Sequence, residues 1–359
     1  MLDRTLDKGD VTVSSRAWFV DRFGGPERLV LRERPDPSPA PGEVLVRTAA
    51  IGVNFADLFA RAGAYPNTPK PPFVPGMEIS GVVESVGAGV TAVAPGAKVV
   101  AVPIFGGYAE RVVCRQSNVF PLPDGVDLVE AAAMPVAFLT ARYAIAEAQV
   151  RPGETVVVTA AAGGVGTALL QLLARLPAKT VALVGSEKKI ALCRELGAER
   201  AGLYAAAGRA DLLGDGRVDV VIDAIGGATF RALWPRLARG GRYVLYGFAA
   251  ASGKRGVAKL QALRELVAMG FLSPYSFVSA CRSLIGFNLS LLPNRLSELR
   301  TAANEIFLDW KAGRVRPIVG PRFEFERLPD AHRALASRKT EGKVVVGVRS
   351  PLTTMNPKD

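Results

Sequence analysis

The sequence predicts an α/β protein that combines an N-terminal β domain with a doubly wound parallel sheet. Residues 17–125 contain short Val-rich runs bounded by Gly, Pro and Asp, which is typical of antiparallel strands and turns. After about residue 131, continuous apolar runs alternate with helical patterns, as in parallel sheets covered by helices. We therefore assign residues 1–137 and 310–359 to the first domain and residues 138–309 to the second.

The first domain is expected to be a compact barrel. Four Val-rich runs carry this prediction, at residues 43–53, 79–90, 97–105 and 108–114. Two later runs, "VRPIVGPRFEF" and "GKVVVGV", also have strand character and are most simply placed back in this domain. The first fifteen residues mix acidic and basic side chains without an apolar centre, so we expect a loose extension and no secretion signal.

The second domain is expected to alternate strands and helices. Strands are predicted at residues 154–160, 180–185, 218–227 and 242–248, and helices at residues 131–148, 165–176, 187–198, 230–241 and 297–313. Pro177, Gly197 and Gly240 lie near the expected helix ends, where such residues are common.

The composition is that of a globular protein, with 49% hydrophobic and 22% charged residues. The net charge of +12 comes mostly from scattered arginines, so it favours a pocket for anionic cofactors and is no strong signal for nucleic-acid binding. Pro135 and Arg142 interrupt the most apolar stretch, so we predict no membrane span. The three cysteines are far apart in the sequence, which suits a reducing compartment, and we predict a cytoplasmic location.

The run "TVVVTAAAGGVG", residues 155–166, predicts a dinucleotide site. A strand that ends in a glycine turn and then opens a helix directs backbone N–H groups and the positive end of the helix dipole at one point. The run matches the fingerprint G-x-G-x-x-G, with Ala161 in the place of the first glycine. We therefore expect a Rossmann sheet whose turn holds a pyrophosphate through the backbone of Ala162, Gly163, Gly164 and Val165.

The end of the next strand predicts NADPH as the cofactor. An acidic residue at this place would bind a ribose 2′-hydroxyl and repel a 2′-phosphate. The chain instead has Ser186 there, 20 positions after Gly166, and Lys188 and Lys189 follow. Glu187 counts against NADPH unless its side chain points outward.

Two further strand ends are expected to line the nicotinamide half of the site. Small residues follow both strands, and ligands bind at the carboxyl edge of such sheets. The prediction names the backbone around Ala224, Gly226 and Gly247. Ordinary turns between strand and helix are the alternative interpretation.

The motifs "GVNFADLFARAGAYP", "PGMEISGVVESVG" and "AAGGVG" resemble, in this order, those of the medium-chain dehydrogenase/reductase superfamily. The resemblance runs from about Ala17 to Val348 and implies a GroES-like β-barrel domain beside the Rossmann domain. Zinc-dependent members carry Cys, His and Cys where this chain has Asn54, Met77 and Val136. An amide, a thioether and an alkyl group do not make a zinc site, so we expect no metal.

Within the superfamily, the chain resembles quinone oxidoreductases, polyketide enoyl reductases and especially the branch that contains the vesicle amine transport protein. This resemblance implies cofactor contacts from Asn54, Thr140, Ser186, Lys189, Tyr204, Phe287, Asn288, Leu289 and Lys343. Phe59 stands where some bacterial quinone reductases have a pocket tyrosine, so the pocket loses a hydroxyl group.

The chemistry expected without a metal is hydride addition to an electron-poor π system. No strong Lewis acid is then present to polarise an alcohol, whereas a quinone or an enone is already electrophilic. Tyr65 is the candidate proton donor, with bulk water as the alternative source and a pocket wall as the alternative role. Asn54 is expected to orient a substrate carbonyl or the cofactor ribose, or else to fix a turn. Asp57 is expected to support the loop.

Aromatic residues outside the motifs are candidates for the substrate pocket. Tyr275, with Phe271 and Phe277, is expected either to form an apolar lid or to pack in the core. His332, the single histidine, is expected to pack or to cap a helix.

These observations predict an NADPH-dependent, metal-free reductase of quinones or α,β-unsaturated carbonyls. One alternative is an enoyl reductase for carrier-bound thioesters, with an acyl carrier protein as partner. A second alternative is an NADPH-binding, vesicle-associated or RNA-associated protein without catalysis. The resemblance further implies a homodimer that pairs the sheet edges of the cofactor domains.

Overall fold

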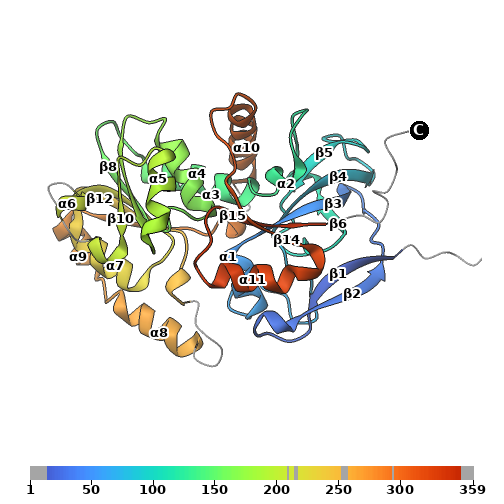
Figure 1. Cartoon of the computed structure of the whole chain (residues 1–359), viewed down its shortest axis with the longest axis horizontal. Coiled ribbons are helices and arrows are strands. Elements are labelled where there is room, and N and C mark those ends of the chain that lie inside the picture. Colours follow the sequence, from blue (N-terminus) through green and yellow to red (C-terminus); the bar gives the residue numbers. More distant parts are fainter. Residues whose placement is uncertain (1–13, 208–209, 214–216, 252–257, 293–294, 349–359) are drawn as a thin grey trace, which may run out of the picture.

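The computed structural model describes residues 14–207, 210–213, 217–251, 258–292 and 295–348. Two sheets lie side by side along the long axis of the molecule, with the chain passing from one to the other and back (Figure 1). The predicted extension over the first fifteen residues lies almost wholly outside the described residues.

The first sheet has seven strands and confirms the GroES-like β domain. Its strands are β3 (Glu43–Val53), β4 (Glu78–Val86), β5 (Lys98–Ala101), β6 (Arg111–Arg115), β7 (Val119–Pro121), β14 (Val319–Glu324) and β15 (Lys343–Gly347). The strand order is β14-β15-β3-β4-β5-β7, and β6 also pairs with β3. A hairpin of β1 (Ser14–Val20) and β2 (Leu29–Pro35) lies beside it. The two C-terminal strands therefore return to this domain, as predicted.

The second sheet is the predicted doubly wound parallel sheet. Its strands are β8 (Thr155–Val158), β9 (Lys179–Val184), β10 (Arg200–Leu203), β11 (Val218–Asp223), β12 (Leu237–Leu245) and β13 (Ser283–Gly286). All neighbours pair in parallel in the order β10-β9-β8-β11-β12-β13. The strand order reverses between β8 and β11, which is the crevice where dinucleotides bind in such folds.

Helices cover the sheets and connect the two domains. Those of the GroES-like domain are α1 (Phe55–Arg61), α2 (Leu128–Ala131) and α11 (Leu328–Ala336). Those that follow strands of the Rossmann sheet are α4 (Gly164–Leu173), α5 (Ile190–Glu195), α6 (Ala210–Leu213), α7 (Gly227–Leu233), α8 (Ala258–Ala268) and α9 (Pro274–Ala280). The connecting helices α3 (Pro135–Ala148) and α10 (Leu296–Lys311) contribute Phe138, Leu139, Ala303 and Phe307 to the core under the Rossmann sheet. Both predicted domain boundaries fall inside these connecting helices and stay predictions.

The helix predicted at residues 230–241 is wrong in its second half. Helix α7 ends at Leu233, and β12 already begins at Leu237, which is fully buried and pairs with Val218. The register between β11 and β12 then shifts, and Gly240 takes a φ of +78° within the shifted segment. Glycine adopts this backbone conformation without steric cost, so β12 continues through the irregular segment. In the sequence, the same glycine resembles the end of a helix.

The two domains contact each other beside the glycine turn. Gly342, just before β15, forms a bridge with Gly163, and its N–H donates to the Ala162 carbonyl at 2.8 Å. The C-terminal strand of the GroES-like domain is therefore held against the turn that follows β8. No helix among the described residues has the length and apolar character needed to cross a bilayer.

Candidate active site

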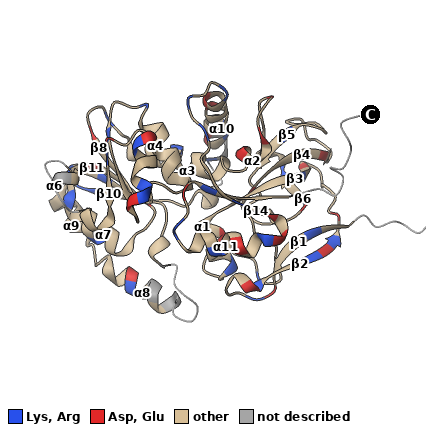
Figure 2. Cartoon of the chain, in the orientation of Figure 1, with Lys and Arg blue, Asp and Glu red and all other residues tan. Residues whose placement is uncertain are grey.

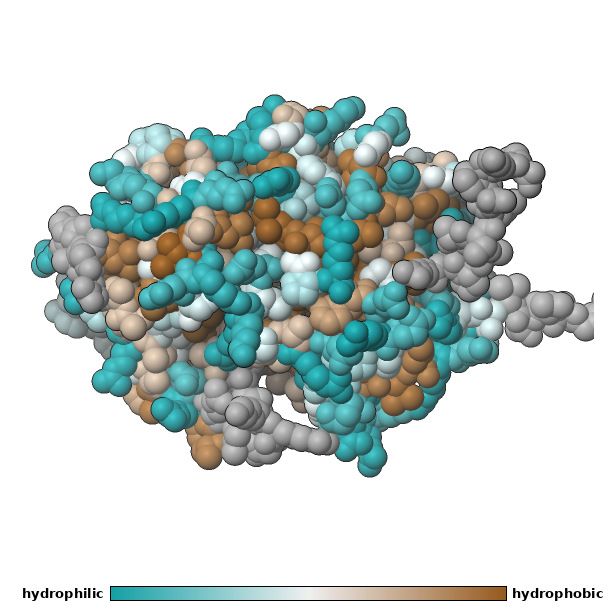
Figure 3. Space-filling view, in the orientation of Figure 1, coloured by the Kyte–Doolittle hydropathy of each residue, from teal (hydrophilic) through white to brown (hydrophobic). Residues whose placement is uncertain are grey.

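A cavity of about 2510 Å³ lies between the two domains. Hydrophobic residues gather along the middle of the front face, where the domains meet (Figure 3). The lining contains Asn54, Phe59, Tyr65, Thr140, Ala162, Gly163, Gly164, Val165, Ser186, Lys189, Tyr204, Ala224, Gly226, Gly247, Phe287, Asn288, Leu289 and Lys343. The fold thus brings together every predicted site residue except Tyr275.

The prediction that Tyr275 lines the pocket is wrong. Tyr275 lies on α9 outside the cavity lining, and the residue is 76% exposed. Phe277, two positions later on the same helix, packs against Trp234 with ring centroids 5.7 Å apart. Because residues two apart face different sides of a helix, the packing of Phe277 turns Tyr275 to the surface. Phe271 is also almost fully exposed, so the predicted lid is absent from this conformation.

The glycine turn after β8 leaves helix donors free for an anion. The N-cap of α4 is Gly163 in extended conformation, and no side chain caps the helix. The first N–H groups of α4 therefore face the cavity without a side-chain acceptor. A Cβ on Gly166 would lie 2.3 Å from the Ala160 carbonyl oxygen, so the close approach of helix and turn requires glycine there.

A buried carboxylate fixes the neighbouring turn after β11. Asp223 accepts hydrogen bonds from the backbone N–H groups of Ile225 at 2.8 Å and Gly226 at 3.0 Å. It also accepts from the hydroxyl of Thr159 at 2.7 Å, and the Thr159 oxygen accepts from the N–H of Ala224 at 2.9 Å. These bonds lock the two strand ends at the crevice to each other. The sequence interpretation missed this role of Asp223, although an aspartate at a strand end followed by two glycines was a usable signal.

The end of β9 offers a polar subsite. The Ser186 hydroxyl is buried and has no hydrogen-bond partner among the described residues. The Tyr204 hydroxyl accepts from the N–H of Ala160 at 2.8 Å and keeps its own proton for a further acceptor. An unpartnered buried hydroxyl beside a donor fits a phosphate oxygen, so these residues are compatible with the cofactor that the sequence predicts.

Lys189 reaches the cavity wall in a way that the sequence did not indicate. Its ammonium group donates to the backbone carbonyls of Arg338 and Thr340 at 2.9 and 2.7 Å, and burial lowers its pKa. The charge of Lys189 thus holds the loop before β15 in place. Arg338 and Lys339 of that loop line the cavity as well, and sequence reasoning missed them because they follow Ser186 by about 150 positions.

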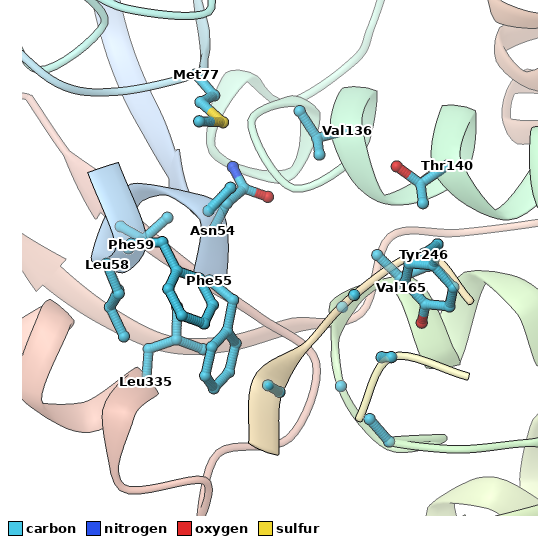
Figure 4. A pocket seen from close by; sticks show the side chains of 18 of the residues that line it. Asn54, Phe55, Leu58, Phe59, Met77, Val136, Thr140, Val165, Tyr246 and Leu335 are labelled. Atoms are coloured by element: carbon cyan, nitrogen blue, oxygen red, sulfur yellow. The ribbon is translucent and has the colours of Figure 1, made fainter. Parts of the chain in front are cut away.

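The three positions matched to zinc ligands in the sequence analysis lie together at one end of the cavity. Asn54 lies between Met77 and Phe59, and Val136 and Thr140 face them from α3 (Figure 4). The fold therefore brings these three positions together in one cavity, and an amide, a thioether and an alkyl group do not suit zinc. No cluster of three His, Cys, Asp or Glu side chains suited to a metal occurs in the described part of the chain.

The side-chain amide of Asn54 is hydrogen-bonded to a buried ion pair between Glu78 and Lys343. The Nδ2 of Asn54 donates to Glu78 Oε1 at 2.8 Å, and the ammonium of Lys343 contacts both Glu78 Oε1 and Asn54 Oδ1. The second Glu78 oxygen accepts from the N–H of Val136 at 2.8 Å. The amide of Asn54 is therefore used to hold Lys343 in the wall of the cavity. Neither Glu78 nor its pairing with Lys343 was predicted, because the two residues are far apart in the sequence.

His332 packs in the domain core, which confirms its predicted role. Its Nδ1 lies 2.8 Å from Arg61 Nη1, and its Nε2 lies 2.9 Å from the Tyr108 hydroxyl. A guanidinium only donates, so Nδ1 accepts and Nε2 carries the proton toward Tyr108. Burial and the neighbouring Arg61 lower the pKa of His332, so the ring stays neutral.

Asp57 supports the loop before α1, as predicted. Its Oδ2 accepts the N–H of Asn54 at 2.8 Å and closes a capping box at the start of the helix. Complete burial raises the pKa of Asp57 to about 7, although the Asn54 N–H and the charge of Lys343 act in the opposite direction.

Asp57→Asn should change the pH dependence of stability. The unfolded chain loses the Asp57 proton near pH 4, whereas the folded protein keeps it to about pH 7. The stabilisation of the folded protein that comes from the raised pKa is complete below the unfolded pKa and declines as pH rises toward 7. Urea unfolding between pH 5 and 6.5 should therefore show the wild type losing about 1.4 kcal/mol per pH unit relative to the variant. Asp124→Asn, at an exposed turn, is the control, and a flat difference between wild type and Asp57→Asn would contradict the assignment.

Comparison with known proteins decides the family. Residues 40–124 match the alcohol dehydrogenase GroES-like domain, and residues 196–346 match the zinc-binding dehydrogenase domain. The bovine "Quinone oxidoreductase-like protein 2" is 36% identical over 332 residues, which cover 90% of each chain. This chain belongs to the quinone oxidoreductase-like medium-chain dehydrogenase/reductase family.

A solved structure and a second curated relative are also similar to this medium-chain oxidoreductase. The quinone oxidoreductase of Thermus thermophilus, solved also in complex with NADPH, is 37% identical with a TM-score of 0.76 and covers 92% of this chain and 99% of its own. The rat "Synaptic vesicle membrane protein VAT-1 homolog" is 31% identical over 345 residues, or 92% of this chain and 83% of the relative. Nicotinamide cofactors are thus bound within the family, and the zinc in the name of one matching domain does not fit the residues of this oxidoreductase.

Proposed function

We propose that this oxidoreductase reduces quinones or α,β-unsaturated carbonyl compounds with NADPH and without a metal. The observation that carries the proposal is one cavity that joins the uncapped N-terminus of α4 to the site formed by Asn54, Met77 and Val136. A dinucleotide subsite therefore lies beside a catalytic end whose donors do not suit zinc, and activation of an alcohol by a Lewis acid has no support there.

The chain's own residues account for binding at each part of the cofactor. The start of α4 would hold the pyrophosphate, and Ser186, Tyr204, Arg338 and Lys339 would surround the 2′-phosphate. When bound, NADPH supplies the hydride. Lys343, held by Glu78 and Asn54, lies next to the glycine turn, since its Cδ is 3.2 Å from the Cβ position of Gly164. In this proposal, Lys343 places a positive charge under the cofactor, and Tyr65 returns a proton to the reduced substrate.

The test is a screen of NADPH oxidation with quinones, enones and enoyl thioesters, the last presented both free and on an acyl carrier protein. Turnover with quinones or free enones supports the proposal, while activity confined to carrier-bound thioesters would favour a dedicated enoyl reductase. Lack of turnover with all acceptors would contradict an enzymatic role. Tyr65→Phe in the same screen tests the proton donor, since removal of a general acid slows turnover by about 100-fold or more.

Ser186→Asp should weaken NADPH binding while sparing NADH. The new carboxylate would stand where the 2′-phosphate is expected and would repel it, but it can accept the 2′-hydroxyl of NADH. Loss of a charge-assisted bond costs about 1.5–3 kcal/mol, which corresponds to a 10- to 100-fold rise in the NADPH dissociation constant. Calorimetric titration with both cofactors measures this, with Ser186→Ala as the milder control. An equal loss for the two cofactors would contradict a 2′-phosphate subsite at Ser186.

We further propose a homodimer that forms along β13. This strand ends the Rossmann sheet in the described structure, and Leu284 on it is 37% exposed. Close to it in the sequence, α8, α9 and the segment between them expose large apolar side chains, namely Leu260, Leu263, Leu266, Val267, Phe271, Tyr275 and Val278. An open strand edge and an exposed apolar surface are both covered when two copies pair edge to edge. Light scattering should give twice the chain mass, and Phe271→Asp should lower it.

Two further features bear on the partners and the location of the protein. Lys and Arg are spread along the ribbon of both domains (Figure 2), which favours a small-molecule substrate over a nucleic acid. Cys114 and Cys193 are free and buried, in keeping with the proposed cytoplasmic location.

A further inference from the structure

A small polar cluster spans the two domains above the cavity. Tyr65 follows α1 in the GroES-like domain, while Asn288 and Ser290 follow β13 in the Rossmann domain. The Tyr65 hydroxyl lies 2.9 Å from Asn288 Oδ1 and 2.8 Å from Ser290 Oγ, and Ser290 Oγ lies 2.9 Å from Asn288 Oδ1. All three residues line the cavity and are partly buried.

The orientation of the Asn288 amide determines how the protons are shared. Its Oδ1 also accepts the backbone N–H of Ser290 at 3.1 Å and so caps the short helix Leu289–Leu291. This bond presents the carbonyl oxygen, and not the NH₂ group, to the two hydroxyls. A carbonyl oxygen only accepts, so Asn288 can hold the Tyr65 proton but cannot donate one to a tyrosine that has lost it.

Ser290 is the other group in contact with the Tyr65 oxygen, and a hydroxyl both donates and accepts. If Tyr65 gives its proton to a substrate, the phenolate oxygen remains 2.8 Å from Ser290 Oγ. The Ser290 O–H can then turn from Asn288 to the phenolate, where a charge-assisted hydrogen bond is stronger than one between neutral groups. The cluster therefore contains a way to stabilise the deprotonated form of Tyr65.

We propose that Ser290 relays a proton to Tyr65 during the reduction, an inference that rests on the proposed function. The substrate receives the hydride at its electron-poor carbon and the phenolic proton of Tyr65 at the site of negative charge. The Tyr65 O–H bond breaks as the substrate bond to hydrogen forms. Ser290 passes its proton to the phenolate oxygen as it takes one from solvent, and the hydroxide left is neutralised by a proton from the bulk buffer, so both hydroxyls end as they began. Ser290 is a positioning and relay residue, and Tyr65 is the group that meets the substrate.

In the alternative interpretation, the same contacts only hold the two domains together over the cofactor site. We call this role a clasp. The two roles predict different kinetics. A clasp changes the affinity for NADPH, whereas a relay changes the proton-transfer step at saturating cofactor. Because Ser290 and Tyr65 act in one step under the relay, the effects of removing both are not additive.

The experiment compares Ser290→Ala, Ser290→Thr, Tyr65→Phe and the double variant Tyr65→Phe/Ser290→Ala, with an enone as acceptor. Under the relay, Ser290→Ala lowers kcat by about 10-fold or more, raises the solvent deuterium isotope effect and leaves the NADPH dissociation constant unchanged. Ser290→Thr, which keeps the hydroxyl, restores most of the rate. The double variant is no slower than Tyr65→Phe alone.

Three outcomes would overturn the relay: an unchanged kcat in Ser290→Ala, an effect confined to NADPH affinity, or multiplicative losses in the double variant. Each of these leaves the proposed function intact, because the wild type still turns over. A wild type that oxidises NADPH with no quinone or enone would remove the proposed function and the relay together. Circular dichroism and urea unfolding confirm that each variant is folded before its rate is interpreted.

Discussion

Lys343→Met should lower the free energy of unfolding by about 3–5 kcal/mol, because it strands a buried negative charge. Glu78 has no exposed surface, and Lys343 supplies the positive charge that compensates it. Without the ammonium, the carboxylate keeps only the hydrogen bonds from Asn54 and from the N–H of Val136. The cost of an unpaired buried charge exceeds the loss of a single hydrogen bond. Urea unfolding at pH 7 without cofactor measures the effect.

Two controls separate the ion pair from ordinary packing. The double variant Glu78→Gln/Lys343→Met removes both charges and should recover most of the lost stability, since a neutral pair needs no compensation. Arg327→Met breaks an exposed pair with Asp330 and should change stability by less than about 1 kcal/mol. If the double variant were no more stable than Lys343→Met alone, the stranded charge would not be the cause.

Gly166→Ala should strongly weaken cofactor binding. The added Cβ would lie 2.3 Å from the Ala160 oxygen and 2.5 Å from the Ala161 oxygen, both of which belong to rigid backbone. The turn before α4 must therefore move, and the N–H groups proposed to hold the pyrophosphate move with it. We expect a loss of NADPH affinity on the order of 100-fold or more, because displacement of a binding group by about 1 Å has that effect. Overpacking should also cost about 1–3 kcal/mol of stability.

Calorimetric titration with NADPH measures the affinity, and Gly347→Ala is the matched control. A Cβ on Gly347 would approach the Phe323 oxygen only to 3.9 Å, an ordinary contact in the strand β15. This control should bind NADPH like the wild type. Unchanged affinity in Gly166→Ala would falsify the assignment of the turn as the pyrophosphate site.

The sequence predictions that the fold brings together in one cavity rest mainly on neighbours along the chain. The strand β8, the glycine turn and α4 form one continuous segment, so their order and their glycine spacing indicate a helix N-terminus aimed at an anion. Ser186 was found in the same way, because the end of β9 follows the turn by a near-constant number of residues. The capping role of Asp57 three residues after Asn54 is likewise a local pattern.

Predictions failed where the outcome depended on what an element packs against. The apolar residues of α8 and α9 carry a helical pattern, but no local rule says that Tyr275 stays exposed while Phe277 reaches Trp234. The segment at the start of β12 has a helical pattern and Gly240 resembles a helix stop, whereas pairing of Leu237 with Val218 makes the segment a strand. In both cases tertiary contacts outweigh local preference.

The sequence by itself determined the family, the parallel sheet and the glycine turn before α4, since each depends on spacing within short segments. Only the tertiary structure decided that Glu78 pairs with Lys343, that Lys189 is hydrogen-bonded to the loop of Arg338, and that the hydroxyls of Tyr65 and Ser290 are in contact. The physical reason is that charges and hydroxyls act over a few ångströms, whatever their distance along the chain. Residues separated by about 150 positions or more become partners only through the tertiary fold, within the GroES-like domain for Glu78 and Lys343 and between the two domains for the other pairs.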